Sequence, residues 1–393
     1  MKIHYTAAVS GLLALCSLAP AAPLYQTQDI FPPQEKHTHS SSLVETPEGN
    51  ILACWFQGSG ERTADDVVVN GARLNKGDTA WSSIFLMADT PDFPDTNPVL
   101  WINKNDELRL IWFPVLAHRW ECGYLKYRIA TDYEGPGAPK WSWQDNIHLK
   151  PGEDFGPIMK QKFDEMGFDE GMWAEYARPY REDLENAAKD AYKRQTGWMP
   201  RVHPTTLKSG RVLLPLYSDG FNISLIAISD DDGATWYSSE PLVGVGPTQP
   251  SLIEKKNGTI AAYIRDTGEA PWRIQYSESK DGGVSWSPSV DLDIPNPDSS
   301  LEVIQLKSGE WLMVCNDLAD SRAQLTAYLS DDEGVTWKWK RHIESIESGD
   351  HEFSYPSVIQ SRDGNIQMTY TRKTDAGKTI AHTVVNMEWL KGE

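Results

Sequence analysis

Short stretches that alternate apolar and polar residues recur along most of the chain, and this spacing is typical of β-strands. Residues 224–229 and 325–329 are examples. Many stretches follow a tight turn with glycine, which is typical of a β-hairpin. Six such turns occur, at Glu48-Gly49, Asp106-Glu107 (without glycine), Ser209-Gly210, Asn257-Gly258, Ser308-Gly309 and Asp363-Gly364. The pattern therefore predicts six similar units of short strands.

A repeated motif gives these units a fixed length. Residues 229–236, 279–286 and 330–337 align without gaps on the pattern Ser-x-Asp-x-Gly-x-Thr/Ser-Trp. The repeats begin 279 − 229 = 50 and 330 − 279 = 51 residues apart, which fits one four-stranded propeller blade per repeat. The Asp carboxylate can accept backbone N–H groups across a turn, and the Trp can pack between neighbouring sheets. Trp81 and Trp141 are expected to end degenerate copies in the first two units. We predict an all-β, six-bladed β-propeller.

One segment, residues 152–197 approximately, departs from the strand pattern. Pro179 is suited to open a helix and Gly197 to close one. An apolar helical face is predicted at Leu184, Ala187, Ala188, Ala191 and Tyr192. The segment is too short for a second domain, so we interpret it as a helical insertion between blades 2 and 3. Two roles stay open for it: a structural clasp, or a rim that shapes a substrate pocket.

The N-terminus has the parts of a secretory signal peptide. A lysine at position 2 precedes an apolar run over residues 7–18 and the small-residue site Ala19-Pro20-Ala21-Ala22. We therefore predict a signal peptide over residues 1–22, export to a periplasm or beyond, and a single domain over residues 23–393. Cys54, Cys122 and Cys315 remain, an odd number without CxxC spacing, and we expect mainly buried free thiols.

Charge and composition exclude some classes of function. The 393 residues include 37 Lys+Arg and 56 Asp+Glu, a formal net charge of −19. Because a nucleic-acid-binding protein needs a basic face, we expect no nucleic-acid partner. We also expect no stable membrane insertion, because no later stretch is long and apolar enough. No metal-ligand spacing is present, and we expect no metal or cofactor. An anionic substrate held by a few buried arginines remains compatible with the acidic surface.

The repeats resemble the Asp-box of the sialidase superfamily, and further segments extend the resemblance over most of the chain. They are His39-Ser-Ser-Ser-Leu, Asn97-Pro98, Tyr263-Ile-Arg265, the segment from Arg322 to Leu329, and Phe353-Ser-Tyr355-Pro. Sialidases grip the carboxylate of sialic acid with three arginines, for which the planar guanidinium is suited. The resemblance implies this role for Arg265 and Arg322. His39 stands in place of the first arginine, and Arg201 or Arg372 are the candidates to replace it.

The resemblance also implies a nucleophile and its partners. Tyr355 matches the nucleophilic tyrosine, which a glutamate activates in the family. Pro247 stands at the matching position of that glutamate, so Glu302 is a candidate substitute, and Gln249 in the same segment is a candidate substrate-binding residue. Without a carboxylate at Tyr355, an inverting reaction by activated water becomes the alternative.

The acid/base of the family lies on a loop after the inner strands of the first blade. In this chain the loop carries two candidates, Glu61 as the better match and Asp65 as the second. Glu61 would protonate the leaving oxygen.

The sequence therefore predicts an exo-α-sialidase that releases terminal sialic acid from glycans, with mucin-type O-glycans as one substrate class. Two alternatives stay open. One is a lyase or glycosidase acting on uronic-acid glycans, in which His39, His203 and Tyr355 would serve as acid and base. The other is a non-catalytic glycan-binding propeller, since fold alone does not decide among these activities.

Overall fold

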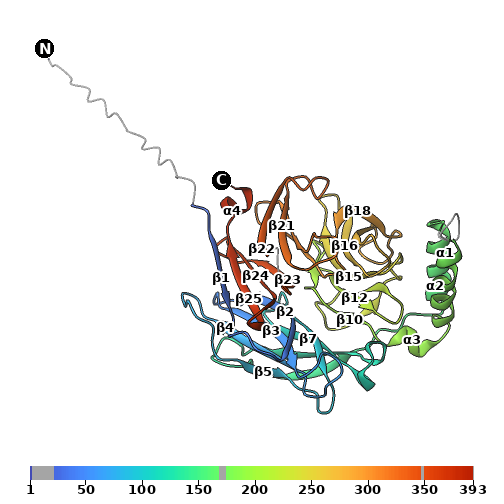
Figure 1. The fold of residues 1–393 in the computed structure, drawn as a ribbon, viewed down its shortest axis with the longest axis horizontal. Helices are drawn as coiled ribbons and strands as arrows, with labels where there is room; N and C mark the ends of the chain where they lie inside the picture. Colours follow the sequence, from blue (N-terminus) through green and yellow to red (C-terminus); the bar gives the residue numbers. More distant parts are fainter. Residues whose placement is uncertain (2–21, 168–173, 347–348, 393) are drawn as a thin grey trace.

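The computed structural model describes Met1 and residues 22–167, 174–346 and 349–392. The predicted signal peptide, residues 1–22, lies almost wholly outside these ranges. Within them the strands form six antiparallel sheets arranged around one axis (Figure 1). The predicted six-bladed β-propeller is thereby confirmed.

Blades 1 to 3 follow the chain in order. Blade 1 contains β2 (His37–Glu45), β3 (Ile51–Gly58), β4 (Val68–Leu74) and β5 (Phe85–Ala88). Blade 2 contains β6 (Asp95–Ile102), β7 (Leu108–Pro114), β8 (Leu125–Ala130) and β9 (Trp143–Ile147), with two 3-10 turns, Leu116–His118 and Trp120–Cys122, between β7 and β8. Blade 3 contains β10 (Met199–Pro200), β11 (Thr205–Thr206), β12 (Val212–Ser218), β13 (Ile223–Ser229) and β14 (Tyr237–Ser238).

Blades 4 to 6 complete the ring. Blade 4 contains β15 (Pro247–Glu254), β16 (Ile260–Asp266), β17 (Arg273–Ser279) and β18 (Val290–Pro295). Blade 5 contains β19 (Glu302–Gln305), β20 (Trp311–Cys315), β21 (Gln324–Ser330) and β22 (Trp339–Ser345). Blade 6 contains β23 (Glu352–Gln360), β24 (Ile366–Thr374), β25 (Gly377–Val385) and β1 (Tyr25–Asp29), and α4 (Met387–Lys391) follows β25.

The two ends of the described chain meet in blade 6. β1 pairs antiparallel with β25, from Tyr25 opposite Val385 to Asp29 opposite Ala381, as its outermost strand. The N-terminal strand thus completes the last blade, and the chain then continues from β1 into β2 of the first blade, which closes the ring.

The core lies between the blades rather than along the axis. Each apolar cluster combines side chains from two neighbouring sheets; for example, Leu52 and Cys54 of blade 1 pack with Leu110 and Trp112 of blade 2. A central strand such as β12 is buried on both faces, because blades cover it on either side. The described cysteines are free thiols, with Cys54 and Cys315 buried as expected and Cys122 half-buried.

The repeated motif forms the turn between the third and fourth strands of blades 3, 4 and 5. In blade 3 the Asp231 carboxylate accepts the Thr235 N–H at 2.8 Å and the Thr235 hydroxyl at 2.6 Å. The Ser229 hydroxyl accepts the Gly233 N–H at 2.7 Å, and Gly233 has a φ of +84°. Trp236 packs against the apolar cluster between blades 2 and 3. Each residue of the repeated pattern thus has the structural role that its chemistry suggests.

The insertion between blades 2 and 3 is helical, with α1 (Phe155–Glu165), α2 (Ala174–Ala187) and α3 (Ala191–Gln195) at the edge of the ring (Figure 1). Its buried side chains, Phe155, Met159, Phe163, Leu184 and Ala188, join the core of blade 3. The described part of the insertion thus packs on the outside of the propeller, and none of its described residues lines the cavity at the axis.

Two details of the predicted helix were wrong. Pro179 lies inside α2, after its first turn, and does not open it. Tyr192 is exposed, because α2 ends at Ala187 and a separate helix begins at Ala191, which breaks the predicted apolar face.

Candidate active site

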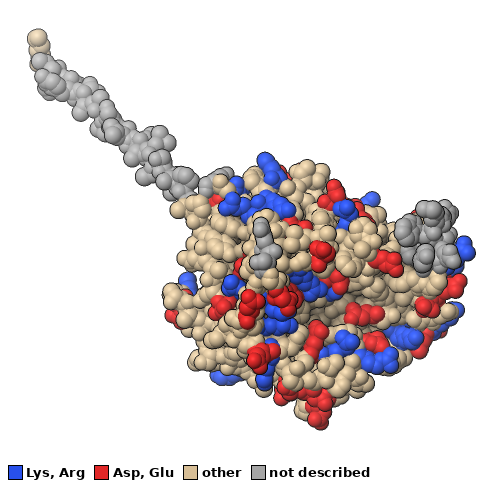
Figure 2. All heavy atoms as spheres, in the orientation of Figure 1, with Lys and Arg blue, Asp and Glu red and all other residues tan. Residues whose placement is uncertain are grey.

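A cavity of about 300 Å³ opens at the propeller axis and takes residues from all six blades. In Figure 2, basic and acidic side chains meet around a hollow near the middle of the face drawn. The cavity is lined by His37, His39, Glu61, Asn97, Trp120, Tyr217, Asp219, Arg265, Arg322, Glu352, Tyr355 and Lys378. Five residues predicted from the sequence are in this group: His39, Glu61, Arg265, Arg322 and Tyr355.

A repeated backbone irregularity aims side chains at the axis. The innermost strands β6, β15 and β23 each contain a bulge, and Asn97, Gln249 and Tyr355 lie in these bulges with φ of +49°, +53° and +58°. Each of the three precedes a proline, which makes this backbone conformation more costly still. Bulges redirect a side chain next to functional sites, and here they bring three polar side chains of different blades together.

Tyr355 is the centre of the site. Its hydroxyl oxygen accepts a hydrogen bond from Arg265 Nη1 at 2.7 Å and lies 3.3 Å from Gln249 Nε2. The His39 ring lies against the phenol ring, with 4.0 Å between centroids. The guanidinium of Arg201 lies 4.8 Å from the ring centroid. Gln249 and Arg201 do not line the cavity themselves, but both contact Tyr355, which does.

Two arginines border the phenol ring. Arg265 Nε donates to Asp298 at 2.7 Å, and the nearby Tyr355 and Asp298 oxygens, which outweigh the effect of burial, raise the pKa of Arg265. Arg322 Nη1 lies 3.1 Å from Glu352, and its guanidinium carbon lies 5.6 Å from the Tyr355 ring centroid. Both guanidinium groups are held in place by a carboxylate while they border the cavity, which is the arrangement that preorganises an anion site.

Two carboxyl groups in the cavity have no hydrogen-bond or ion-pair partner among the described residues. Glu61 lies on the loop between β3 and β4, and Asp219 directly follows β12. The surrounding protein desolvates both groups and raises the pKa of Glu61 and the pKa of Asp219. Asp65, the second candidate for the acid, lies outside the cavity and is paired at 2.8 Å with His118 on the surface.

The place of the first arginine is held by a neutral histidine. His39 Nδ1 lies 2.9 Å from Thr371 Oγ1, and burial, together with His37 and two arginines nearby, lowers the pKa of His39 well below its ordinary value. Arg201 does not supply the missing charge to the cavity. It is 1 % exposed and its guanidinium donates to the carbonyl oxygens of Ser41 and Pro356, beneath Tyr355. These contacts do not favour Arg201 as a substrate ligand.

Arg372 is also excluded as the replacement. Its Nη1 lies 3.2 Å from Asp29 and its Nε 3.6 Å from Glu344, on the outer part of blade 6. Arg372 lies on the same face of β24 as Met368 and Tyr370, which pack in the core between blades 5 and 6. A residue on that face of the strand points toward the neighbouring blade and away from the axis.

Glu302 does not activate Tyr355. Its Oε1 accepts from His203 Nδ1 at 2.7 Å, and its Oε2 accepts the Val358 N–H at 2.6 Å. Burial opposes ionisation of this carboxyl, but the His203 cation and these hydrogen bonds outweigh it and lower the pKa of Glu302. Glu302 is 2 % exposed and its role is to hold blades 3, 5 and 6 together near the axis.

The sequence analysis did not identify several of the lining residues, among them His37, Asp219 and Lys378. Lys378 is the second residue of β25, and its ammonium group has no ion pair among the described residues. It lowers the pKa of His37, which burial already lowers, to about 4. Lys378 is therefore the cation that borders the cavity where the first arginine is absent. Two sequence signals were available: Asp219 directly follows an apolar run, and residues 97, 249 and 355 all precede proline.

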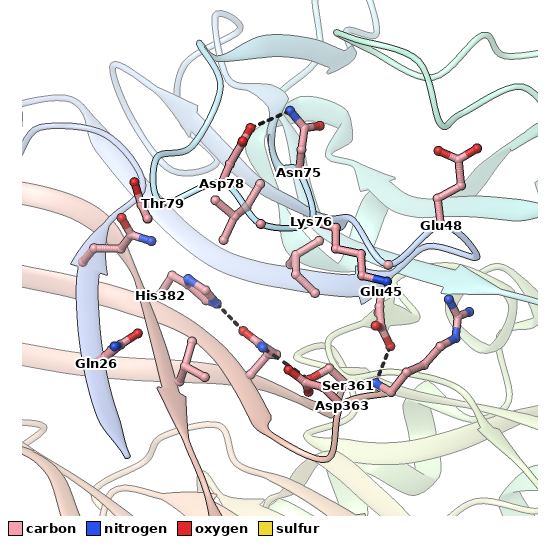
Figure 3. Close-up of a pocket in the computed structure, with 18 of the residues that line it drawn as sticks. Gln26, Glu45, Glu48, Asn75, Lys76, Asp78, Thr79, Ser361, Asp363 and His382 are labelled. Atoms are coloured by element: carbon pink, nitrogen blue, oxygen red, sulfur yellow. Dashed lines mark hydrogen bonds between the residues drawn. The ribbon is translucent and has the colours of Figure 1, made fainter.

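A larger cavity, of about 550 Å³, lies between blades 1 and 6 (Figure 3). It is lined by the ends of β2 and β23 that are far from His37 and Tyr355, including Glu45, Ser361 and Asp363. His382 and Asn75 border it from β25 and from the turn after β4. None of the site residues predicted from the sequence borders this cavity, so the smaller axial cavity is the candidate active site.

Comparison with known proteins places the chain among sialidase-like proteins. The model of a BNR repeat-like domain matches residues 198–368, which cover blades 3 to 5 and part of blade 6. The sialidase of Micromonospora viridifaciens is 28 % identical over 174 residues, covering 42 % of this chain and 25 % of the relative. The chain is thus similar to sialidase-like proteins over blades 3 to 6. The match covers only about a quarter of the length of that curated relative.

Solved structures share the fold of this sialidase-like chain. A protein of unknown function from Dyadobacter fermentans has a TM-score of 0.67 at 15 % identity, covering 92 % of this chain and 99 % of its own. A Hadza microbial sialidase has a TM-score of 0.66 at 14 % identity, covering 90 % of this chain and 66 % of its own. At these identities the likeness extends to the propeller and not to the reaction.

Two further properties concern the residues that the structure describes. No group of three or more His, Cys, Asp or Glu side chains in these ranges is arranged to hold a metal ion. None of the described helices has the length and apolar character needed to cross a membrane.

Proposed function

We propose that the protein is an exo-α-sialidase that releases terminal sialic acid from glycoconjugates, with mucin-type O-glycans as one substrate class. The observation that carries the proposal is the convergence of Arg265, Arg322, Tyr355 and Glu61 in one axial cavity. They come from blades 4, 5, 6 and 1, and no local feature of the chain requires them to meet. An exported enzyme, as predicted from the N-terminus, would encounter such glycans.

The cations of the cavity are suited to a sugar acid. Arg265 and Arg322 present planar guanidinium groups, and Lys378 adds a third positive charge from β25. Guanidinium–carboxylate pairs are directional and bidentate, so two of them fix both the charge and the orientation of the substrate carboxylate. In this proposal Lys378 replaces the first arginine of the family.

The size of the cavity favours an exo mode of action. About 300 Å³ is at the lower end of the range for ligand pockets, which suits one terminal sugar better than an internal segment of a polysaccharide. Glu61 is the proposed acid, because burial raises its pKa and so keeps it protonated to a higher pH than an exposed glutamate.

One assay separates this function from its alternatives. The purified protein is incubated with sialylated mucin glycans, and free sialic acid is measured by chromatography. In parallel, uronic-acid polysaccharides are followed by the ultraviolet absorbance of unsaturated products. Release of sialic acid supports the proposal. Unsaturated uronates without sialic acid would establish a lyase, and binding without any product would establish a glycan-binding propeller.

A further inference from the structure

The surroundings of Tyr355 do not suit a tyrosine nucleophile. A phenol needs a base to take its proton, and the two groups that contact its hydroxyl are Arg265 and Gln249. Arg265 only donates hydrogen bonds. Gln249 is a neutral amide whose Oε1 has no other partner in the described structure, and an amide in either orientation takes no proton. No carboxylate of the described residues forms a hydrogen bond with the Tyr355 hydroxyl.

The nearest acidic residues around Arg265 and Arg322 are already engaged. Asp298 accepts from Arg265 at 2.7 Å. Glu352 Oε1 accepts from Arg322 at 3.1 Å and from the Ser354 hydroxyl at 2.6 Å. Both carboxylates therefore hold the anion-binding arginines, and a base must be found elsewhere in the cavity.

Glu61 and Asp219 remain, and they have the properties of an acid and base pair. They line the same cavity from blades 1 and 3, and neither carboxyl group has a partner among the described residues. Burial raises the pKa of both carboxyl groups; Arg265 and Arg62 oppose this effect at Asp219, and the charge of Asp219 adds to it at Glu61. The charge of Asp219 therefore disfavours ionisation of both groups at once. Two carboxyl groups in opposite protonation states are the requirement for an inverting glycosidase.

We infer that the glycosidic bond is broken in one displacement, with Asp219 activating water and Glu61 protonating the leaving oxygen. This inference rests on the proposed sialidase function. The water oxygen forms a bond to the anomeric carbon, its proton passes to the Asp219 carboxylate, and the bond from the anomeric carbon to the aglycone oxygen breaks. Glu61 gives its proton to that oxygen, and exchange with solvent restores both carboxyl groups. Tyr355 then positions the sugar and Arg265 and forms no covalent intermediate.

The decisive measurement is the anomer of the first product. Proton NMR of an α-sialoside digest, recorded before mutarotation, is expected to show the β-anomer of sialic acid appearing first. Appearance of the α-anomer first would overturn the inference while leaving the sialidase function intact. Absence of any sialic acid would instead overturn the proposed function, so the two failures are distinguishable.

Matched variants test the roles of the side chains. Asp219→Asn is expected to lower kcat by about 10²–10⁴-fold, the usual contribution of a general base. Asp219→Glu is expected to recover part of the loss. Tyr355→Phe removes a positioning hydrogen bond and is expected to lower kcat/KM by roughly tenfold, with the β-anomer still formed first. The control is Asp65→Asn, a surface carboxylate on the same loop as Glu61. A Tyr355→Phe enzyme without activity beside an Asp219→Asn enzyme with wild-type kcat would refute the inference.

Discussion

Replacement of Lys378 by methionine tests the proposed substitute for the first arginine. Methionine keeps much of the length and the apolar stem of the lysine side chain and removes only the charge. Lys378 is half-buried and lies near the start of β25, where its backbone also pairs with Gln34. Those main-chain bonds do not depend on the side chain, so the variant is expected to fold.

The magnitude follows from the kind of contact that is lost. A hydrogen bond to a charged group contributes about 1.5–3 kcal/mol, and each 1.4 kcal/mol corresponds to about tenfold in affinity. Because Lys378 is half-buried, water screens part of this energy, so the lower end applies and KM is expected to rise about tenfold. The substrate carboxylate carries its charge in the ground state and in the transition state, so kcat is expected to change little.

Steady-state kinetics on a chromogenic α-sialoside measure both constants. The same assay on the methyl ester of the substrate provides the second arm, since an ester offers no negative charge to Lys378. The wild type is expected to prefer the acid over the ester, and Lys378→Met to lose about tenfold of that preference, in line with the lost charge-assisted bond. Lys378→Arg is expected to keep it. Lys338→Met is the control, because Lys338 pairs with Asp331 at 3.1 Å on the surface of blade 5. An unchanged KM and an unchanged preference in Lys378→Met would show that Lys378 is not a carboxylate ligand.

Two further predictions concern the acid and the repeats. Glu61→Gln is expected to lower kcat/KM by about 10²–10⁴-fold on natural sialosides and far less on a 4-nitrophenyl leaving group, which needs no proton. Because a protonated Glu61 is the active form and its pKa is raised, wild-type activity is expected to fall as pH rises through that pKa, and pH profiles of Glu61→Gln are expected to lack this limb. Asp281→Ala removes the acceptor of the Ser285 N–H and hydroxyl in the blade 4 box. Calorimetry is expected to find a free energy of unfolding that is lower by about 1–3 kcal/mol. Its kcat is expected to be unchanged, and a loss of activity without a loss of stability would contradict the structural role of the box.

The blades could be predicted from the sequence because their signals are local. The box residues Ser229, Asp231, Gly233 and Thr235 contact one another within a single turn, so their spacing in the chain is the spacing of the contacts. The same holds for the hairpin turns that set the number of blades. The pairing of β1 with β25 could not be predicted from such local signals, because Tyr25 and Val385 lie at opposite ends of the chain.

Side chains at the axis were only partly predictable, because their depth depends on several blades at once. Arg201 and Glu302 lie near the axis as expected, but below Tyr355, where neighbouring blades bury them. The choice of Arg372 as a candidate could have been avoided from the sequence, since the alternation of side chains along a strand places Arg372 on the same face as Met368. Nothing in the sequence around Lys378 indicated a role in the site, because a lysine near the start of an outer strand is common. Its place beside the cavity depends on how the blades assemble into the ring.

The departures from the sialidase pattern are mutually dependent. His39, which stands in place of the first arginine, lies against the Tyr355 ring, and the Tyr355 hydroxyl contacts the neutral amide of Gln249 rather than a carboxylate. Tyr355 therefore has no negatively charged hydrogen-bond partner among the described residues, and its charged neighbours are Arg201, Arg265 and Arg322. The charges reappear around the rim of the same cavity, as Lys378 and Asp219. An anionic sugar still meets the cations and the pair of carboxyl groups that hydrolysis requires, but the tyrosine is no longer the group on which the chemistry depends.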